Sequence, residues 1–151
     1  MTDFEEAMAV LGRELGLELQ VRDGVASFDA MVDVASGASM RIDLTHVPER
    51  RGVMVSAHVG ELPQEGGEEL CRTLLEANHL FEGTGGATFS VEPETQQIRF
   101  EFCGMLDLIG DSDDEKFMEY FLNVAESWRK RIAEPSEIKI SEMPRFFYLM
   151  A

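Results

Sequence analysis

The chain has 151 residues, with 29 Asp and Glu against 13 Lys and Arg, and its formal net charge is −16. The hydrophobic fraction of 44% is that of an ordinary globular protein, and the length predicts a single folded domain. A chain this negative is repelled by phosphate backbones and by anionic membrane surfaces, which argues against nucleic-acid and lipid partners. The charge favours solubility and attraction to basic partners.

Targeting and redox signals point to the cytoplasm. No run approaches the roughly 18 apolar residues needed to cross a bilayer, so we expect no membrane insertion. The first residues carry neither the basic region nor the apolar run of a signal peptide. Cys71 and Cys103 each lie in a periodic apolar segment, as expected for reduced, half-buried thiols. We therefore predict a cytoplasmic protein.

The first predicted element is a helix. Its apolar residues recur at intervals of three and four: Phe4, Met8, Leu11 and Leu15. Thr2 and Glu5 have the spacing of a capping box, and Gly16 is suited to end the helix. Three segments of alternating apolar and polar residues follow, over 26–34, 40–46 and 53–59, and they predict an antiparallel meander with one wet face.

The second half of the chain predicts two more helices and two more strands. The second helix begins at about Glu68, and its apolar stripe is Leu70, Leu74, Ala77 and Phe81. Strands are predicted over 87–91 and 97–103, and a third helix runs from a capping signal at 112–115 to about residue 132, before Pro135. The order α-β-β-β-α-β-β-α predicts an α+β domain, with three helices and a twisted antiparallel five-stranded sheet. We assign residues 1–134 to this domain and 135–151 to a C-terminal tail.

The sequence contains no convincing catalytic or metal-binding motif. Residues 83–86 read Gly-Thr-Gly-Gly, but they follow a helix and precede a strand, whereas a phosphate loop opens a helix. Residues 111–115 resemble the start of a calcium loop, but Lys116 and Leu122 replace the required Gly and Glu. The three histidines lack zinc-ligand spacing. We therefore predict no enzyme activity, no metal and no cofactor.

The second helix and the following hairpin carry a family resemblance. Residues 74–95, which read LLEANHLFEGTGGATFSVEPET, resemble the signature of type III secretion chaperones of the Tir-chaperone family. That family shows a Leu-Leu-x-x-Asn helix end, a Thr-Gly-Gly-Ala turn, a strand and an acidic Pro-Glu-Thr turn. The element order extends the resemblance from about Thr2 to Ile132.

The resemblance implies a class I effector chaperone. Such a protein is a cytoplasmic homodimer that binds the N-terminal chaperone-binding segment of a secreted effector in extended form. It keeps that effector soluble and competent for export through a bacterial virulence-type secretion apparatus, without ATP hydrolysis. The implied effector-binding residues are Phe4, Met8, Leu11 and Leu15, which are equally plausible as core packing. The implied dimer-interface residues are Leu70, Leu74, Ala77 and Phe89.

Two alternatives remain open at this stage. A protein-interaction or regulatory domain of the same fold, with no role in secretion, would have the same sequence features. The tail adds a separate hypothesis, because residues 138–140 read as a short strand and residues 146–150 form an apolar cluster. We expect the tail to dock on its own subunit or on the dimer partner; the alternative is a disordered tail.

Overall fold

The computed structural model of the protein describes residues 2–33, 35–111 and 113–134. The α-helices are α1 (Asp3–Leu15), α2 (Gly67–Asn78) and α3 (Asp114–Ala133). The strands are β1 (Val21–Arg22), β2 (Val25–Asp33), β3 (Ala38–Val47), β4 (Gly52–Glu61), β5 (Thr88–Val91) and β6 (Gln97–Met105). Three short 3₁₀ turns connect them: η1 (Pro48–Arg50), η2 (His79–Phe81) and η3 (Leu106–Leu108).

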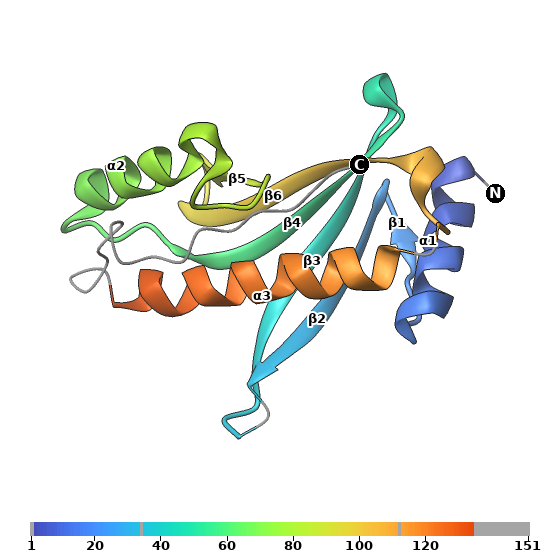
Figure 1. Cartoon of the computed structure of the whole chain (residues 1–151), viewed down its shortest axis with the longest axis horizontal. Coiled ribbons are helices and arrows are strands. Elements are labelled where there is room, and N and C mark those ends of the chain that lie inside the picture. Colours follow the sequence, from blue (N-terminus) through green and yellow to red (C-terminus); the bar gives the residue numbers. More distant parts are fainter. Residues whose placement is uncertain (1, 34, 112, 135–151) are drawn as a thin grey trace. The chain divides into compact units, whose positions relative to one another are not determined.

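The strands form one sheet in the order β1-β2-β3-β4-β6-β5, which confirms the predicted α+β class (Figure 1). The predicted count of five strands is one short, because β1 was not foreseen. β1 is a two-residue strand joined to β2 by the turn at Asp23 and Gly24, both of which have positive φ. Two residues are too few to show the alternation that identifies a strand in a sequence.

The described chain separates into two compact units. The first comprises Met1–Ala57 and Cys103–Leu122, and the second comprises His58–Phe102 and the residues of α3 from Asn123 onward. Strands β4 and β6 and helix α3 each contribute residues to both units.

In the first unit, α1 begins as predicted. The Thr2 side chain accepts a hydrogen bond from the Glu5 backbone amide at 3.2 Å, and Glu5 accepts one from the Thr2 amide at 2.7 Å. Gly16 ends the helix in the left-handed conformation, at φ 68°. Hydrogen bonding of β2 to β3 pairs Ala26 with Leu44, both fully buried. The apolar residues of α1 and of this hairpin therefore supply core to the first unit.

In the second unit, Trp128 of α3 is the largest buried side chain. Its indole Nε1 donates to the Gly83 carbonyl at 2.8 Å, so the Gly-rich turn is fastened to α3. The ring of Phe89 meets Trp128 edge-on, with centroids 4.7 Å apart, and lies 5.1 Å from Phe100. This aromatic group fixes β5, β6 and the second half of α3 to one another.

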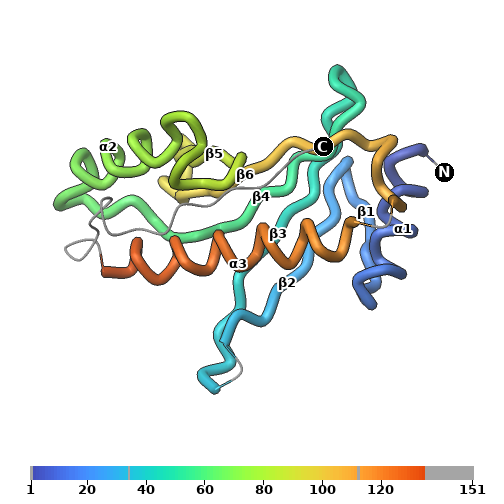
Figure 2. Tube along the Cα trace, in the orientation of Figure 1, coloured from blue at the N-terminus to red at the C-terminus, as the bar shows by residue number. Residues whose placement is uncertain are grey.

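The end of the second helix also differs from the prediction, whereas α3 lies where the sequence predicts it. Helix α2 ends at Asn78 and does not continue through Phe81 as the stripe predicts, because Leu80 and Phe81 take positive φ values that no α-helix contains. Figure 2 shows the turn that separates α2 from β5. Phe81 is therefore half exposed instead of continuing the buried stripe. Ser112, the first residue of the predicted capping signal of α3, and the whole predicted tail lie outside the described residues.

Candidate functional site

The predicted effector-binding stripe of α1 lies mainly against the protein. Phe4, Met8 and Leu11 are buried and Leu15 is half-buried. Phe4 stacks on the imidazole of His46, with ring centroids 4.9 Å apart and planes 10° from parallel. The stripe is thus packed as core, and its role at an effector surface stays a prediction.

The exposed apolar side chains of this region belong to the last residue of β6 and to η3, which follows it. Met105 and Leu108 are both more than half exposed, whereas Leu106 between them is buried. A Cβ placed on Gly110 would lie 3.3 Å from Cγ1 of Val10, which puts this segment directly beside α1. Figure 1 shows the η3 segment running alongside that helix. We call Val10, Met105 and Leu108 the α1–η3 surface.

One edge of the sheet is open along most of β2. Its neighbour on that side, β1, pairs only with Val25 and Ala26. Within the described chain, no other strand flanks Ser27–Asp33 on that side. The backbone of Gly24 points toward β3, because its carbonyl accepts from the His46 amide at 2.8 Å. Since backbone direction alternates along a strand, the N–H and C=O groups of residues 27, 29 and 31 point outward from the sheet.

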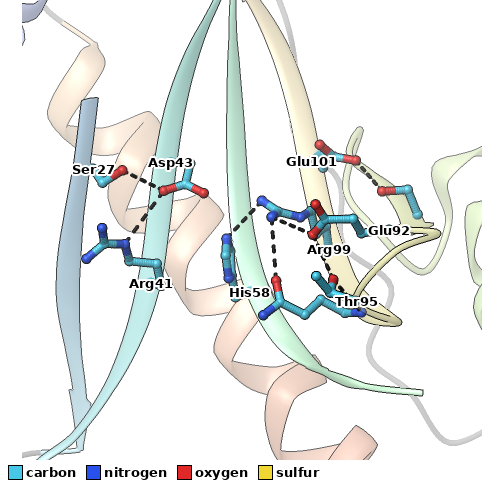
Figure 3. A network of polar contacts seen from close by, with 10 residues as sticks. Ser27, Arg41, Asp43, His58, Glu92, Thr95, Arg99 and Glu101 are labelled. Atoms are coloured by element: carbon cyan, nitrogen blue, oxygen red, sulfur yellow. Dashed lines mark hydrogen bonds and ion pairs between the residues drawn. The ribbon is translucent and has the colours of Figure 1, made fainter. Parts of the chain in front are cut away.

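Acidic side chains line the wet face beside this open edge (Figure 3). The Ser27 hydroxyl donates to Asp43 Oδ1 at 2.6 Å. Arg41 lies 3.5 Å from Asp29 and 3.7 Å from Asp43, so one cation is shared by two carboxylates. Met31, 67% exposed, continues the same row. A strand added here would therefore meet a negative row on this face of the sheet.

The opposite edge of the sheet, at β5, is closed at its centre. The Phe89 amide donates to Oδ1 of Asn78 at 2.9 Å, and Nδ2 of Asn78 donates to the Phe89 carbonyl at 3.4 Å. The side-chain amide of Asn78 thus hydrogen-bonds both outward backbone groups of Phe89, as a neighbouring strand would. Asn78 is the asparagine of the helix-end signature, and this is its structural role.

The predicted dimer-interface residues lie beneath the surface of the second unit. Leu70, Leu74, Ala77 and Phe89 are all buried. The structure brings α2 and β5 together, and the four residues contribute to that packing. A Cβ on Gly83 would lie 2.9 Å from the Ala77 Cβ, so the glycine permits the close approach of the Gly-rich turn. Their role in a dimer stays a prediction.

The turn after α2 exposes two large apolar side chains. Leu80 is 73% exposed and Phe81 is 50% exposed. Their φ values are 53° and 57°, a region in which β-carbon-bearing residues are strained. Sequence reasoning placed Phe81 in the buried stripe, because helical periodicity carries no sign of a left-handed turn.

Polar networks mark the rest of the wet surface. In the second unit, Arg99 donates to Glu92 at 2.9 Å and contacts Nε2 of His58 at 2.8 Å (Figure 3). The hydrogen bond from Arg99, with another from Thr95, lowers the pKa of Glu92. In the first unit, the bidentate contact from Arg51 lowers the pKa of Asp107.

A pair of carboxylates in the first unit shows a pKa shift in the opposite direction. The pKa of Glu14 is raised, first by a hydrogen bond with Asp114 and then by slight desolvation and charge repulsion. Asp114 also accepts from the Gly110 amide at 2.7 Å.

Among the described residues, no group of three or more His, Cys, Asp or Glu side chains is arranged to hold a metal ion. None of the described helices is long and apolar enough to cross a membrane.

Comparison with known proteins decides the family. Residues 7–129 match the Tir chaperone protein (CesT) family. The chain belongs to this family of type III secretion chaperones. The family consists of chaperones and not of enzymes, in agreement with the prediction from the sequence. Among curated proteins, none matches this chain.

Solved structures show that the fold is shared. A chain of the ExsC–ExsE complex matches with a TM-score of 0.64 and 17% identity, covering 86% of this chain and 96% of the other. A chain of the HopA1–SchA chaperone–effector complex matches with a TM-score of 0.61 and 12% identity, covering 85% and 94%. At these identities the likeness establishes the architecture alone.

Proposed function

We propose that this chaperone binds the N-terminal segment of a type III secreted effector in extended form, in the bacterial cytoplasm. Binding keeps the segment soluble and competent for export without ATP hydrolysis. The observation that carries the proposal is the open edge of β2 in a chain of this family. The two similar folds come from complexes titled ExsC–ExsE and HopA1–SchA chaperone–effector, which supports an effector as the partner class.

Strand addition fits the chemistry of that edge. An extended peptide would bond to the outward N–H and C=O groups of residues 27, 29 and 31. Its side chains would alternate between the face that carries Phe28 and Ala30 and the face that carries Asp29 and Asp43. The segment that fits best therefore alternates apolar and basic residues. The net charge of −16 also attracts a basic segment from a distance.

Helix α1 supplies a second contact area in this proposal. The exposed α1–η3 surface takes apolar effector side chains, and the stripe of buried Phe4, Met8 and Leu11 and half-buried Leu15 packs the helix that carries it. Apolar surface of this kind would promote aggregation in a neutral protein. Repulsion between strongly acidic chains opposes that association while no effector is bound.

We propose a homodimer formed through α2 and β5. Leu70, Leu74, Ala77 and Phe89 contribute to the packing that joins helix and strand, which then present the exposed Leu80 and Phe81 to a second copy. An isologous contact repeats each apolar side chain, so two residues per chain give four at the interface. Light scattering is the direct measurement, and a monomer at micromolar concentration would reject the dimer.

Two asparagine substitutions give a sharp test of the dimer contact. Asn tolerates positive φ, so Leu80→Asn with Phe81→Asn removes apolar surface without adding backbone strain. We expect the dimer dissociation constant to rise at least about tenfold, from the loss of two apolar contacts. The matched control is Met105→Asn with Leu108→Asn in the α1–η3 surface, which should leave the dimer intact.

Effector binding is tested by proline on the open edge. Proline at residue 29 removes an outward N–H but leaves the β2–β3 ladder whole, so Asp29→Pro should fold. Asp29→Ala loses the same contact with Arg41 and keeps the N–H. Partners are first captured from the native cytoplasm and identified by mass spectrometry. We then expect Asp29→Pro to lose the effector segment and Asp29→Ala to retain it. Equal binding by both variants would rule out strand addition at this edge.

A non-secretory interaction domain is the second candidate. It would use the same open edge and α1–η3 surface. Capture of a resident cytoplasmic protein, with no secreted protein among the partners, would favour it over the secretion role.

A further inference from the structure

The open stretch of β2 is bounded at both ends. At one end, β1 pairs with Val25 and Ala26, so an added strand would meet β1 there. At the other end, the register of β2 with β3 shifts between Met31 and Asp33, as at a β-bulge. Such a shift changes the direction of the backbone groups that follow and ends regular pairing. The open stretch therefore covers residues 27–31 and offers outward N–H and C=O groups at every second residue.

Asp29 lies at the centre of this stretch, and its carboxylate is largely exposed. The side chain is 60% exposed, and its contact with Arg41 on β3 measures 3.5 Å. Asp43, which shares the same guanidinium, is 18% exposed and also accepts from the Ser27 hydroxyl. Two carboxylates against one cation leave a negative charge on this face. Asp29 is the more exposed of the two, so it is the carboxylate that an added strand meets.

We propose that Asp29 selects a segment with a lysine or arginine at its centre and thereby fixes the register of the bound strand. This selection rests on the strand addition proposed above, and it defines the partner as an extended segment that spans residues 27–31 with one central cation. The residues beside the cation point to the face of buried Ala30 and half-buried Phe28, so apolar side chains fit there. The outer two lie opposite Ser27 and Met31, where uncharged side chains fit.

Distance decides the sign of the interaction. A residue of the added strand lies about 5 Å from the residue opposite it and about 10 Å from the residue on the strand behind. Arg41 pairs with Asp29 on β3, so a central cation is about twice as close to Asp29 as to Arg41. Attraction exceeds repulsion, because Coulomb energy falls with distance and salt screens charges beyond a Debye length of about 8 Å. For a central carboxylate both signs reverse, and binding is weakened.

The bounded ends make a shifted register costly. Because side chains alternate, only a shift by two residues keeps the apolar side chains on the buried face of the sheet. That shift moves the cation from Asp29 to a position opposite Ser27 or Met31, and it carries one end of the segment past the open stretch. The segment then loses main-chain bonds together with its charge pair. Charge and backbone pairing therefore select the same register.

Synthetic peptides with blocked termini test this selection on the full chain. The probe has the central sequence Thr-Val-Lys-Val-Thr, with Gly-Ser on each side. Its matched control, Lys-Val-Thr-Val-Thr in the same flanks, has the same composition, so long-range attraction to the net charge of −16 is equal for both. Dissociation constants are measured at about 0.15 M salt. We expect the central lysine to bind about fivefold more tightly, as one cross-strand ion pair allows.

Substitutions at residue 29 separate its charge from its backbone. Asp29→Asn keeps the size of the side chain and removes the charge, so the two peptides should bind within about twofold of each other. Asp29→Lys should favour a peptide with a central glutamate over the one with a central lysine. The matched control is Glu49→Gln, which makes the same change in net charge as Asp29→Asn at the exposed η1 turn. That control should keep the preference for the central lysine.

Asp29→Pro separates register selection from strand addition itself. If it abolishes binding while the unchanged chain binds both peptides equally, strand addition stands and selection by Asp29 is overturned. If it binds the peptides as tightly as the unchanged chain, the peptides do not add to this edge, and strand addition fails as well. A preference for the central lysine that survives Asp29→Asn would assign the selection to another residue and overturn the role of Asp29. Failure of the unchanged chain to bind the central-lysine peptide at millimolar concentration would overturn it too.

Discussion

The two edges of the sheet, at β5 and along β2, differ in whether they are closed. At β5, the side chain of Asn78 occupies both outward backbone groups of Phe89, and the phenyl ring is held by Trp128 and Phe100. Along β2, residues 27–33 pair with β3 on one side, and no strand of the described chain lies on their other side. A protein that leaves both edges open risks edge-to-edge aggregation. Closing one edge and lining the other with carboxylates limits strand addition to one place.

The largest effect should come from the aromatic group behind the closed edge. Trp128→Ala removes the fully buried indole, and the cavity should lower the free energy of unfolding by about 3–5 kcal/mol. Trp128→Phe keeps most of the ring volume and loses the hydrogen bond to Gly83, so it should be milder. Urea denaturation measures both. Equal losses would mean that the hydrogen bond, and not the packing, holds the β5 end.

The closed edge itself is tested at Asn78. Asn78→Ala leaves the half-buried Phe89 amide and carbonyl without their partner, at a cost of about 1–3 kcal/mol. Asn78→Asp keeps the acceptor for the amide and loses only the donor to the carbonyl. Hydrogen exchange at the Phe89 amide should be fast in the alanine variant and slow in the aspartate variant. Slow exchange in both would show that the edge is closed by something other than Asn78.

This contrast between edges was largely hidden from the sequence. Alternation identified the long strands, and the capping box of Thr2 and Glu5 located α1 to the residue. The order of the strands in the sheet could not be predicted in the same way. Local periodicity does not indicate that β6 lies between β4 and β5. Without the order, no residue can be assigned to an edge. Asn78 was recognisable as part of a signature, but its bond to Phe89 spans a turn that the pattern does not describe.

The candidate site was predictable in outline only. The apolar stripe of α1 was visible, but most of it is core, and the exposed residues beside it come from the end of β6 and from η3. Burial depends on which elements meet, and helical spacing cannot report that. Phe81 shows the same limit: its spacing continues the stripe of α2, while the backbone has already left the helix at Leu80.

A substitution in the turn between α2 and β5 should raise the free energy of unfolding, whereas the substitutions at Trp128 and Asn78 should lower it. Leu80→Gly relieves a positive φ and should raise the free energy of unfolding by up to about 1 kcal/mol, with the gain reduced by glycine's larger unfolded-state entropy. Leu75→Gly is the matched control, since Leu75 is similarly exposed but helical and should lose about 1 kcal/mol. Thermal unfolding of the two variants checks the signs. A loss at residue 80 would mean that the exposed side chain contributes more than the strain.

The smallest effects are electrostatic and distinguish Glu92 in the second unit from Glu14 in the first by their response to pH. Glu92 has a lowered pKa in the folded chain, so its contribution to stability is present at neutral pH and is lost as the pH falls below about 4.3. Glu14 has a raised pKa, so its contribution is favourable below the ordinary glutamate pKa and disappears as the pH rises through the higher pKa of the folded chain. Glu92→Gln should therefore be destabilising at pH 7 and neutral in acid. Glu14→Gln should be stabilising at pH 7, because it removes repulsion from Asp114, and this advantage should fade on acidification. Melting temperatures of both variants between pH 7 and about pH 2 test the opposite slopes, and parallel slopes would contradict the assignment of one ion pair and one carboxylate pair.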